Sequence, residues 1–332
     1  MNLHDGTLVL DTHIDIRWPD TPDWTAETRQ LVDLPKLRAG GVNGAVFIAY
    51  VAQGKRDAQG HAAASARAAA MLEHIAARST AGGTRFCATP DALEACFAAG
   101  DTAVLSAVEN GYAMGQDLSR LGAWRGQGAI YLTVTHDGHN DLADSARPKP
   151  GLGDSAAEHG GLSPLGEQAI AEMNRVGLMI DCAHVAKAGM LRAVELSRVP
   201  VAVTHTACTA LCAHPRGIDD EQLDALRACG GIAQITAVPA FLRTAPAGQP
   251  AQASVADIVD HMEHAIRRIG IEHVGISSDF DGGGAVQGWA DAAQSPAITE
   301  ELARRGYGAR EIGMLWSGNF IRVWRAVLAD RA

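Results

Sequence analysis

The sequence lacks the features that mark several classes of protein. Its six cysteines include no CxxC pair, so they predict neither a structural zinc site nor a redox pair, and we expect them to be reduced and mostly buried. No stretch approaches the roughly 18 apolar residues that a membrane-spanning helix needs. No GxGxxG follows the first apolar run, which removes the main sign of a dinucleotide-binding fold.

The sequence also lacks a targeting signal at its start and an excess of positive charge. Residues 1–11 read MNLHDGTLVLD, without a basic segment followed by an apolar one, so we expect no signal peptide and a cytoplasmic location. A net charge of -10 would repel phosphate backbones, which argues against a nucleic-acid partner. The apolar fraction of 47% is ordinary for a globular protein.

What the sequence does contain is a repeated order of segments. Short, nearly continuous apolar runs alternate with helical stretches, as expected for buried parallel strands joined by helices. The expected strands are 7–10, 45–50, 103–108, 129–135, 178–182, 199–204, 232–236 and 274–277. The clearest helices are 61–79, 163–177, 219–231 and 254–270. Eight strands favour a closed sheet, so we predict a (β/α)₈ barrel of the TIM type, formed by one domain across residues 1–332.

Reactive side chains stand at the ends of six of these apolar runs. They are His13 with Asp15, Glu109, His136, His184, His205 and Asp279. Barrel enzymes carry their chemistry at the C-terminal ends of the strands, which meet at one rim. We therefore expect these side chains to lie close together.

Five of these residues suit a metal site: His13, Asp15, Glu109, His184 and His205. His13 and Asp15 are two positions apart, so in an extended segment both point to the same side. Imidazole nitrogen and carboxylate oxygen suit Zn²⁺, and five ligands exceed the need of one catalytic zinc. We predict two Zn²⁺ ions, with Glu109 as the natural bridge because a carboxylate has two oxygens.

Other histidines lie in expected helices or loops and do not directly follow an apolar run. Four lie in expected helices and are predicted to face solvent: His61, His74, His261 and His264. Three lie in loops on the rim of the barrel, where they could touch a substrate: His139, His159 and His214.

Longer stretches of the sequence resemble the membrane dipeptidase family, which includes renal dipeptidase and bacterial relatives. They are DTHIDI at 11–16, AVENG at 107–111, YLTVTHDGHNDLADS at 131–145, GLSPLGEQAIAEMNRVGLMIDCAHV at 161–185, VTHTACTALCAHPRGIDD at 203–220, HVGISSDFDGG at 273–283 and SGNFIRVW at 317–324. They follow the family's order and cover nearly the whole chain. The resemblance implies a barrel with two zinc ions that cleaves dipeptides.

The resemblance also implies a role for each site residue. One zinc would be bound by His13 and Asp15, the other by His184 and His205, with Glu109 bridging them. His136 would contact the reacting carbonyl group, Arg216 would hold the substrate carboxylate, and Asp279 would be the catalytic acid/base. A hydroxide between the two ions would attack the peptide carbon, and the carboxylate clamp would favour dipeptides over long chains.

The resemblance leaves the substrate open and adds two expectations. Family members often accept a D-residue at the C-terminal position, so L-Xaa-D-Xaa dipeptides are expected substrates, and the family suggests a homodimer. The sequence departs from the family in the segment 18–33, which matches poorly, and in the charged DGHND loop at 137–141, which leaves open the side chains that a substrate would carry. Residues 319–328, NFIRVWRAVL, are not followed by an apolar stretch, so we expect no lipid anchor.

Two alternatives remain at this point. The first is another barrel metal-dependent amidohydrolase that acts on a lactone or a cyclic amide. The HxD start and a bridging Glu109 argue mildly against it. The second is a relative that has lost peptidase activity and serves in binding or tailoring. Every expected ligand and Asp279 are in place, which argues against that one.

Overall fold

The framework of the protein is a parallel sheet. The computed structural model describes residues 3–331, and within them the sheet has nine strands in the order β1-β2-β4-β5-β6-β7-β8-β9, with β3 paired to β4 off this path. The strands are β1 (Leu10–Asp15), β2 (Gly44–Tyr50), β3 (Thr84–Phe86), β4 (Thr102–Glu109), β5 (Ala129–Thr133), β6 (Met179–Asp181), β7 (Ala202–Thr206), β8 (Ile232–Ile235) and β9 (Val274–Ile276).

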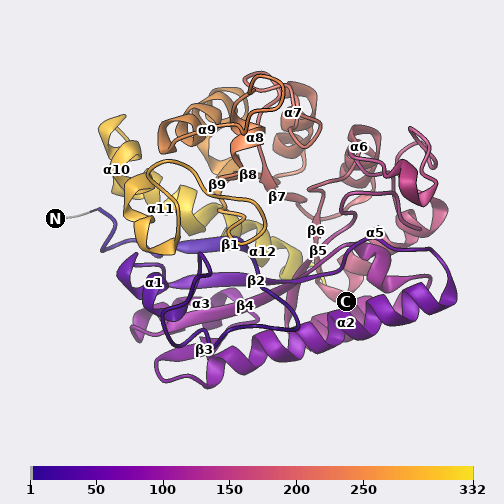
Figure 1. Ribbon diagram of the computed structural model, residues 1–332, viewed down its shortest axis with the longest axis horizontal. Coiled ribbons are helices and arrows are strands. Elements are labelled where there is room, and N and C mark those ends of the chain that lie inside the picture. Colours follow the sequence, from indigo (N-terminus) through magenta and orange to yellow (C-terminus); the bar gives the residue numbers. More distant parts are fainter. Residues whose placement is uncertain (1–2, 332) are drawn as a thin grey trace.

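The two ends of the sheet meet, so the predicted (β/α)₈ barrel is confirmed. The N–H of Asp15 donates to the carbonyl oxygen of Phe280 at 3.0 Å, and the N–H of Asp279 donates to that of His13 at 3.1 Å. These bonds join β1 to the segment that follows β9 (Figure 1). The sequence-based prediction missed β3, because its three residues TRF contain no apolar run.

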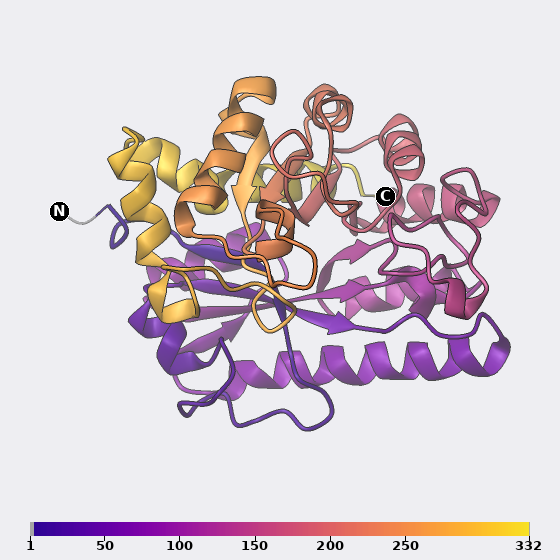
Figure 2. The same cartoon turned by 45° about the horizontal axis from the view of Figure 1, so that its top comes forward.

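Helices cover the outside of the barrel. They are α1 (Leu34–Ala39), α2 (Ala58–Ala77), α3 (Pro90–Ala98), α4 (Ser119–Gly126), α5 (Pro164–Val176), α6 (Lys187–Leu196), α7 (Asp220–Ala228), α8 (Pro239–Leu242), α9 (Val255–Ile269), α10 (Pro296–Arg304), α11 (Ala309–Gly313) and α12 (Asn319–Ala329). The long, alanine-rich α2 packs along β2 and β4, as Figures 1 and 2 show.

Local signals set the ends of the predicted helices. The hydroxyl of Ser163 accepts from the N–H of Gly166 at 3.0 Å and caps α5, whose first residue is Pro164. Gly177 ends the same helix with a φ of 73°, a conformation that costs glycine little. Asp219 begins α7 through a reciprocal capping box with Gln222.

The first strand lies later in the chain than predicted. It covers Leu10–Asp15 instead of residues 7–10, because polar residues that read as a loop are buried within it. Asp11 shows how they are accommodated: its carboxylate accepts from the backbone N–H of Ser278 at 3.0 Å and of His13 at 3.3 Å. His13 and Asp15 are therefore strand residues, held in place by ladder hydrogen bonds.

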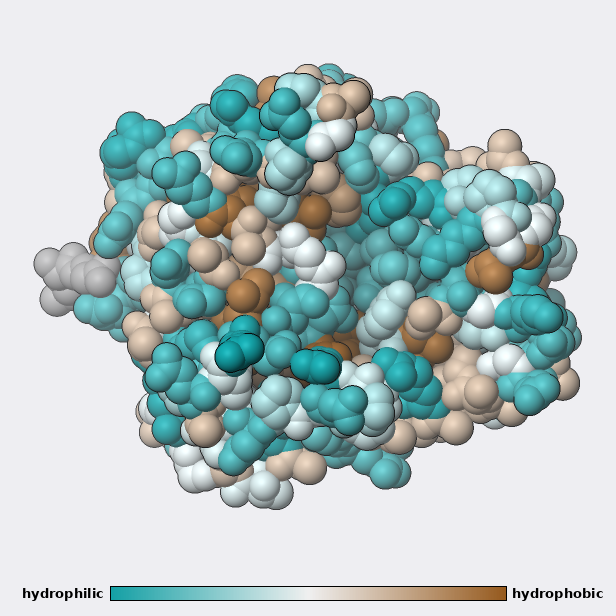
Figure 3. Space-filling view, viewed as in Figure 1, coloured by the Kyte–Doolittle hydropathy of each residue, from teal (hydrophilic) through white to brown (hydrophobic). Residues whose placement is uncertain are grey.

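The apolar side chains are largely buried between the sheet and the helices. Among residues 3–331, Leu152 and Leu211 are the large hydrophobic residues that stand exposed, and the face drawn in Figure 3 mixes hydrophilic with scattered hydrophobic residues. All six cysteines are free, and five are buried, as expected. Within the described part of the chain, the helices are too short or too polar to cross a membrane.

Candidate metal centre and substrate cavity

The residues predicted to bind metal come together at the C-terminal rim of the barrel. Glu109 is the last residue of β4 and lies at the centre of the group. The Nε2 atoms of His13, His184 and His205 lie 3.7, 3.4 and 3.5 Å from its carboxylate oxygens. Side chains from three further strand ends therefore converge on one buried carboxylate.

The orientation of His13 follows from its second ring nitrogen. Its Nδ1 lies 2.9 Å from the hydroxyl of Tyr131, and that hydroxyl donates to the carbonyl oxygen of Thr12 at 2.8 Å. Since the hydroxyl's proton is used, it accepts from His13, so the proton of the neutral ring sits on Nδ1. In the neutral ring the lone pair of Nε2 faces Glu109, which is the arrangement of a metal-ligating histidine. Burial would lower the pKa of His13, but the charge of Glu109 raises it to about 9, and a cation bound at Nε2 would take the place of that second proton.

His205 and His184 are held in the same way. The hydroxyl of Thr204 donates to the buried carboxylate of Asp181 at 2.7 Å and lies 3.0 Å from Nδ1 of His205, from which it accepts. Nδ1 of His184 lies 3.2 Å from a carboxylate oxygen of Asp137. Each ring thus has its proton on the outer nitrogen and its lone pair turned to the centre.

The donor set fits metal ions. Potential ligand atoms form three groups, and within each group all atoms lie within 4.8 Å of one another. The groups are His13 with Glu109 and His205, Glu109 with His136 and His184, and His13 with Asp15 and Asp279. Glu109 belongs to two of these groups, as a bridging carboxylate would. Its buried Oε1 has no hydrogen-bond partner among residues 3–331, and a buried carboxylate oxygen without a donor is costly unless a cation faces it.

The electrostatics of the centre also favour a cation. Burial raises the pKa of Asp15 well above its usual value, and the charge of Glu109 raises it further. Burial likewise raises the pKa of Asp279 to about 7. Burial lowers the pKa values of His184 and His205 well below the ordinary value, so both rings are neutral. Carboxylates crowded in a buried space repel one another, and bound cations would relieve that repulsion.

Two of the residues have an uncommon backbone conformation. His184 has a φ of 66° and Asp279 a φ of 59°, both in the left-handed region that side chains other than glycine rarely adopt. Such conformations cost free energy and cluster at functional sites, where the surrounding structure enforces them. Here each one turns a side chain toward the centre directly after a short strand.

A cavity of about 440 Å³ opens over the centre. Its lining contains the predicted site residues Asp15, Glu109, His136, His184, His205 and Asp279. Its lining also contains Asp137, Arg147 and Phe241, which no sequence pattern marked, and His214, one of the three loop histidines expected at the rim. Asp137 joins the predicted ligand His184 to Arg147, whose guanidinium lies 3.1 Å from the same carboxylate.

Arg216 lies beside this cavity and does not itself line it. Its side chain is 3% exposed, and one guanidinium nitrogen donates to the carbonyl oxygen of His205 at 3.1 Å. Its Nε has no hydrogen-bond partner in the described part of the chain, and burial lowers its pKa to about 10. The guanidinium carbon lies 5.3 Å from the ring centre of Phe241. A buried, incompletely paired cation suits a carboxylate partner.

The sequence offered little sign of the residues that orient the histidines. Tyr131 lies inside an apolar run and reads as core, and Thr204 reads as an ordinary strand residue. Asp137 stands next to His136 in the sequence, but its contact with His184 depends on how two loops approach each other. Asp181 was the available sign of these partners, because an acidic residue inside the apolar run 178–182 is unusual and needs hydrogen-bond donors such as Thr204.

The prediction that four helical histidines face solvent was wrong for His261. It is 1% exposed, its Nδ1 accepts from the N–H of Cys208 at 2.9 Å, and its Nε2 lies 3.1 Å from the carbonyl oxygen of Leu242. The ring points from helix α9 toward the inside of the protein, where it contacts the backbone of Cys208 and of Leu242. His61, His74 and His264 are partly buried, so they do not stand free in solvent either.

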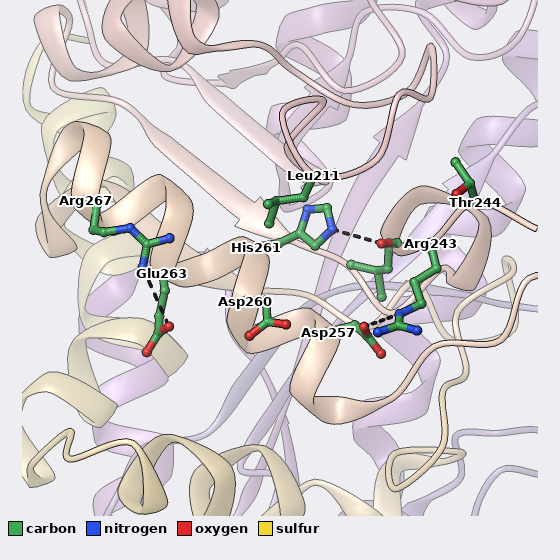
Figure 4. A pocket seen from close by; sticks show the side chains of 9 residues that line it. Leu211, Arg243, Thr244, Asp257, Asp260, His261, Glu263 and Arg267 are labelled. Carbon is green, nitrogen blue, oxygen red and sulfur yellow. Dashed lines mark hydrogen bonds and ion pairs between the residues drawn. The ribbon is translucent and has the colours of Figure 1, made fainter.

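His261 lies in a second hollow, of about 500 Å³, which Figure 4 shows. Arg243 pairs with Asp257 there, and Arg267 pairs with Glu263. Both ring nitrogens of His261 are used by the backbone. This hollow therefore offers paired charges on the outside of the barrel and no ring nitrogen free to bind a metal.

The loop histidines differ from one another. Both nitrogens of His139 are used, since Nδ1 accepts from the N–H of Ser145 at 2.9 Å and Nε2 lies 3.0 Å from the carbonyl oxygen of Ser155. Nε2 of His159 lies 2.8 Å from the carbonyl oxygen of Asn140. These two rings hold the rim loop together, whereas His214 lines the cavity.

Comparison with known proteins places the chain in a family. The family model described as membrane dipeptidase (peptidase family M19) matches residues 1–331. The chain is 34% identical over 232 residues to dipeptidase tcpJ of Claviceps purpurea, covering 70% of this chain and 52% of that protein. It is 34% identical over 220 residues to dipeptidase aclJ of Aspergillus oryzae, covering 66% and 50%. The chain thus spans about half the length of these curated relatives.

Solved structures agree with this assignment. The probable dipeptidase PvdM from Pseudomonas aeruginosa superimposes with a TM-score of 0.93 at 26% identity, over 99% of this chain and 97% of that one. A metallo peptidase from Rhodobacter sphaeroides, liganded with a phosphinate mimic of the dipeptide L-Ala-D-Ala, gives a TM-score of 0.85 at 26% identity, over 97% and 99%. The chain belongs to the membrane dipeptidase family, peptidase family M19.

Proposed function

We propose that the protein is a dipeptidase that uses two Zn²⁺ ions at the rim of the barrel. The observation that carries the proposal is the convergence of three histidine Nε2 atoms on the buried carboxylate of Glu109. His13 and Asp15 would hold one ion, His184 and His205 the other, and Glu109 both. Family membership supports the peptide substrate, and the donor set of nitrogen and carboxylate oxygen supports zinc.

Bound metal ions would activate a water molecule and polarise the peptide carbonyl group. The chain's own residues supply the other functions. His136 would donate to the reacting carbonyl oxygen, and its Nδ1 has no partner among residues 3–331. Asp279 would take a proton and pass it to the leaving amine, a task suited to a carboxyl group with a pKa near neutrality. Arg216 would hold the free carboxylate of the substrate.

The proposed substrates are dipeptides, including those with a D-residue at the C-terminus. The Rhodobacter sphaeroides structure is liganded with a mimic of L-Ala-D-Ala, which supports this chirality for the present chain. A carboxylate clamp explains a preference for dipeptides, since a longer peptide has no carboxylate at that position. The single domain across residues 1–332, the cytoplasmic location and the homodimer stay predictions.

The test is a substrate panel on the zinc-loaded protein. We expect hydrolysis of dipeptides and none of lactones or cyclic amides, with about two zinc ions per chain by elemental analysis. Asp279→Asn is expected to keep its zinc and lose about 10²- to 10⁴-fold in kcat, because proton transfer is removed. Cleavage of lactones alone would contradict the proposed function, and normal turnover by the variant would contradict the role of Asp279.

A further inference from the structure

His214 is a residue of the cavity lining that the proposed mechanism does not use. It lies in the loop between β7 and α7, two positions before Arg216. The backbone N–H of Arg216 donates to Nδ1 of His214 at 3.1 Å. Because Nδ1 accepts this bond, the neutral ring must carry its proton on Nε2. The fold thus fixes the tautomer of His214 as well as its place.

The donor on the other side of the ring is unused. Nε2 of His214 has no hydrogen-bond partner among residues 3–331, and the ring borders the cavity. Burial lowers the pKa of His214, and the positive charges of Arg147 and Arg216 lower it further, so the ring stays neutral at pH 7. A neutral imidazole with Nδ1 occupied can act only as a donor through Nε2.

His214 and Arg216 lie against the same aromatic ring. The ring centres of His214 and Phe241 are 4.5 Å apart with 31° between the planes. The guanidinium carbon of Arg216 lies 5.3 Å from the centre of Phe241. Arg147 adds a further positive charge at the mouth of the cavity. An imidazole N–H in the cavity lining therefore lies close to a buried cation beside the cavity, which is the combination that recognises a carboxylate.

We propose that His214 is a second anchor for the C-terminal carboxylate of a dipeptide, donating from Nε2 to one oxygen while Arg216 holds the other. This inference rests on the proposed function and deepens it. A contact with a carboxylate far from the scissile bond forms in the ground state and persists in the transition state. It should therefore set KM and leave kcat nearly unchanged.

Two replacements separate this role from a structural one. In His214→Asn the amide oxygen takes the place of Nδ1 and can still accept from Arg216, but the donor at Nε2 is lost. In His214→Gln the amide nitrogen takes the place of Nε2, but the acceptor at Nδ1 is lost. We expect His214→Asn to raise KM for L-Ala-D-Ala about 10- to 100-fold, the usual loss for a hydrogen bond to a charged group, with kcat nearly unchanged. His214→Gln is expected to recover part of the lost affinity.

The C-terminal amide of the same dipeptide is the matched substrate control. We expect KM for the amide to change little in His214→Asn, because the amide lacks the charge that strengthens the bond. Affinity for a phosphinate mimic of L-Ala-D-Ala, measured by calorimetry, should fall in the same order as KM rises. His264→Asn, on the outside of α9, serves as the matched protein control.

The outcomes are distinct. A KM increase that is confined to the free-acid substrate supports the anchor. An unchanged KM in His214→Asn, or an equal increase for acid and amide, overturns it, because the ring would then serve only the loop of Arg216. Wild-type zinc protein that cleaves no dipeptide overturns the proposed function and this inference with it, whereas turnover by wild type together with an unaltered His214→Asn overturns the inference alone.

Discussion

At the scale of single residues, the site depends on which atom of each histidine carries its proton. Tyr131, Thr204 and Asp137 each contact an outer ring nitrogen and leave Nε2 turned toward Glu109. None of these residues is a predicted ligand. Their contribution is to fix the ring and its tautomer before a metal arrives, which reduces the entropy lost on binding.

Tyr131→Phe tests this arrangement. The substitution keeps the ring and removes the hydroxyl that accepts from His13, so we expect metal affinity to fall about 10- to 100-fold. Competition with a chromophoric chelator measures that affinity without any substrate. Tyr112→Phe is the control, because its hydroxyl donates to the carbonyl oxygen of Lys55. Equal metal affinity in both variants would show that the hydroxyl of Tyr131 does not orient His13.

At the scale of the elements, the loops after the strands decide how close the carboxylates come. The loop after β9 carries Asp279 and turns back so that Gly282 lies directly against Asp15. A Cβ built on Gly282 would collide with the carboxylate oxygens of Asp15 and Asp279. The absence of a side chain at this position is what allows two acidic groups on different elements to share one side of the centre.

Gly282→Ala is therefore expected to displace one or both carboxylates. We expect a loss of metal affinity and about a 100-fold fall in kcat/KM, the size of effect that a displacement near 1 Å can cause. Gly126→Ala is the control, since a Cβ at this helical glycine of α4 meets open space. Isothermal titration with Zn²⁺ and steady-state kinetics measure the two effects. An alanine variant of Gly282 with native zinc binding would mean that the loop has room to move.

At the scale of the whole molecule, metal binding and folding stability are coupled. The barrel brings Asp15, Glu109 and Asp279 from β1, β4 and the loop after β9 into one buried space. These groups meet only in the folded chain, so an ion bound between them stabilises the folded state. The repulsion among the carboxylates acts in the opposite direction when no cation is bound.

Removal of metal is expected to lower both activity and stability. We expect the chelated protein to lose turnover and to unfold at a lower temperature, with both restored by added Zn²⁺. At a free zinc concentration of 1,000 times Kd the stabilisation would be about 4 kcal/mol. Scanning calorimetry with and without chelator measures the shift, and Mg²⁺ in place of Zn²⁺ is the control. Full turnover and an unchanged Tm in metal-free protein would exclude a metal-dependent enzyme.

The barrel and the residues that gather at its rim could be predicted from the sequence alone. Buried parallel strands require continuous apolar runs, and the ends of such runs face one rim, so the convergence of His13, Glu109, His184 and His205 could be read from order alone. Local signals also fixed helix ends, as at Ser163 and Gly177. These features depend on short stretches of chain, which is why a single sequence reveals them.

The protonation, orientation and contacts of these groups depend on how distant segments of the chain pack together. The partners of the outer ring nitrogens, the inward turn of His261, the late start of β1 and the shared place of His214 and Arg216 beside Phe241 all join segments far apart in the chain. The physical reason is that spacing along a strand fixes the face on which a side chain lies, whereas its hydrogen-bond partner is set by how separate elements pack. The sequence thus predicts the members of the site, and the packing determines their protons, orientation and contacts.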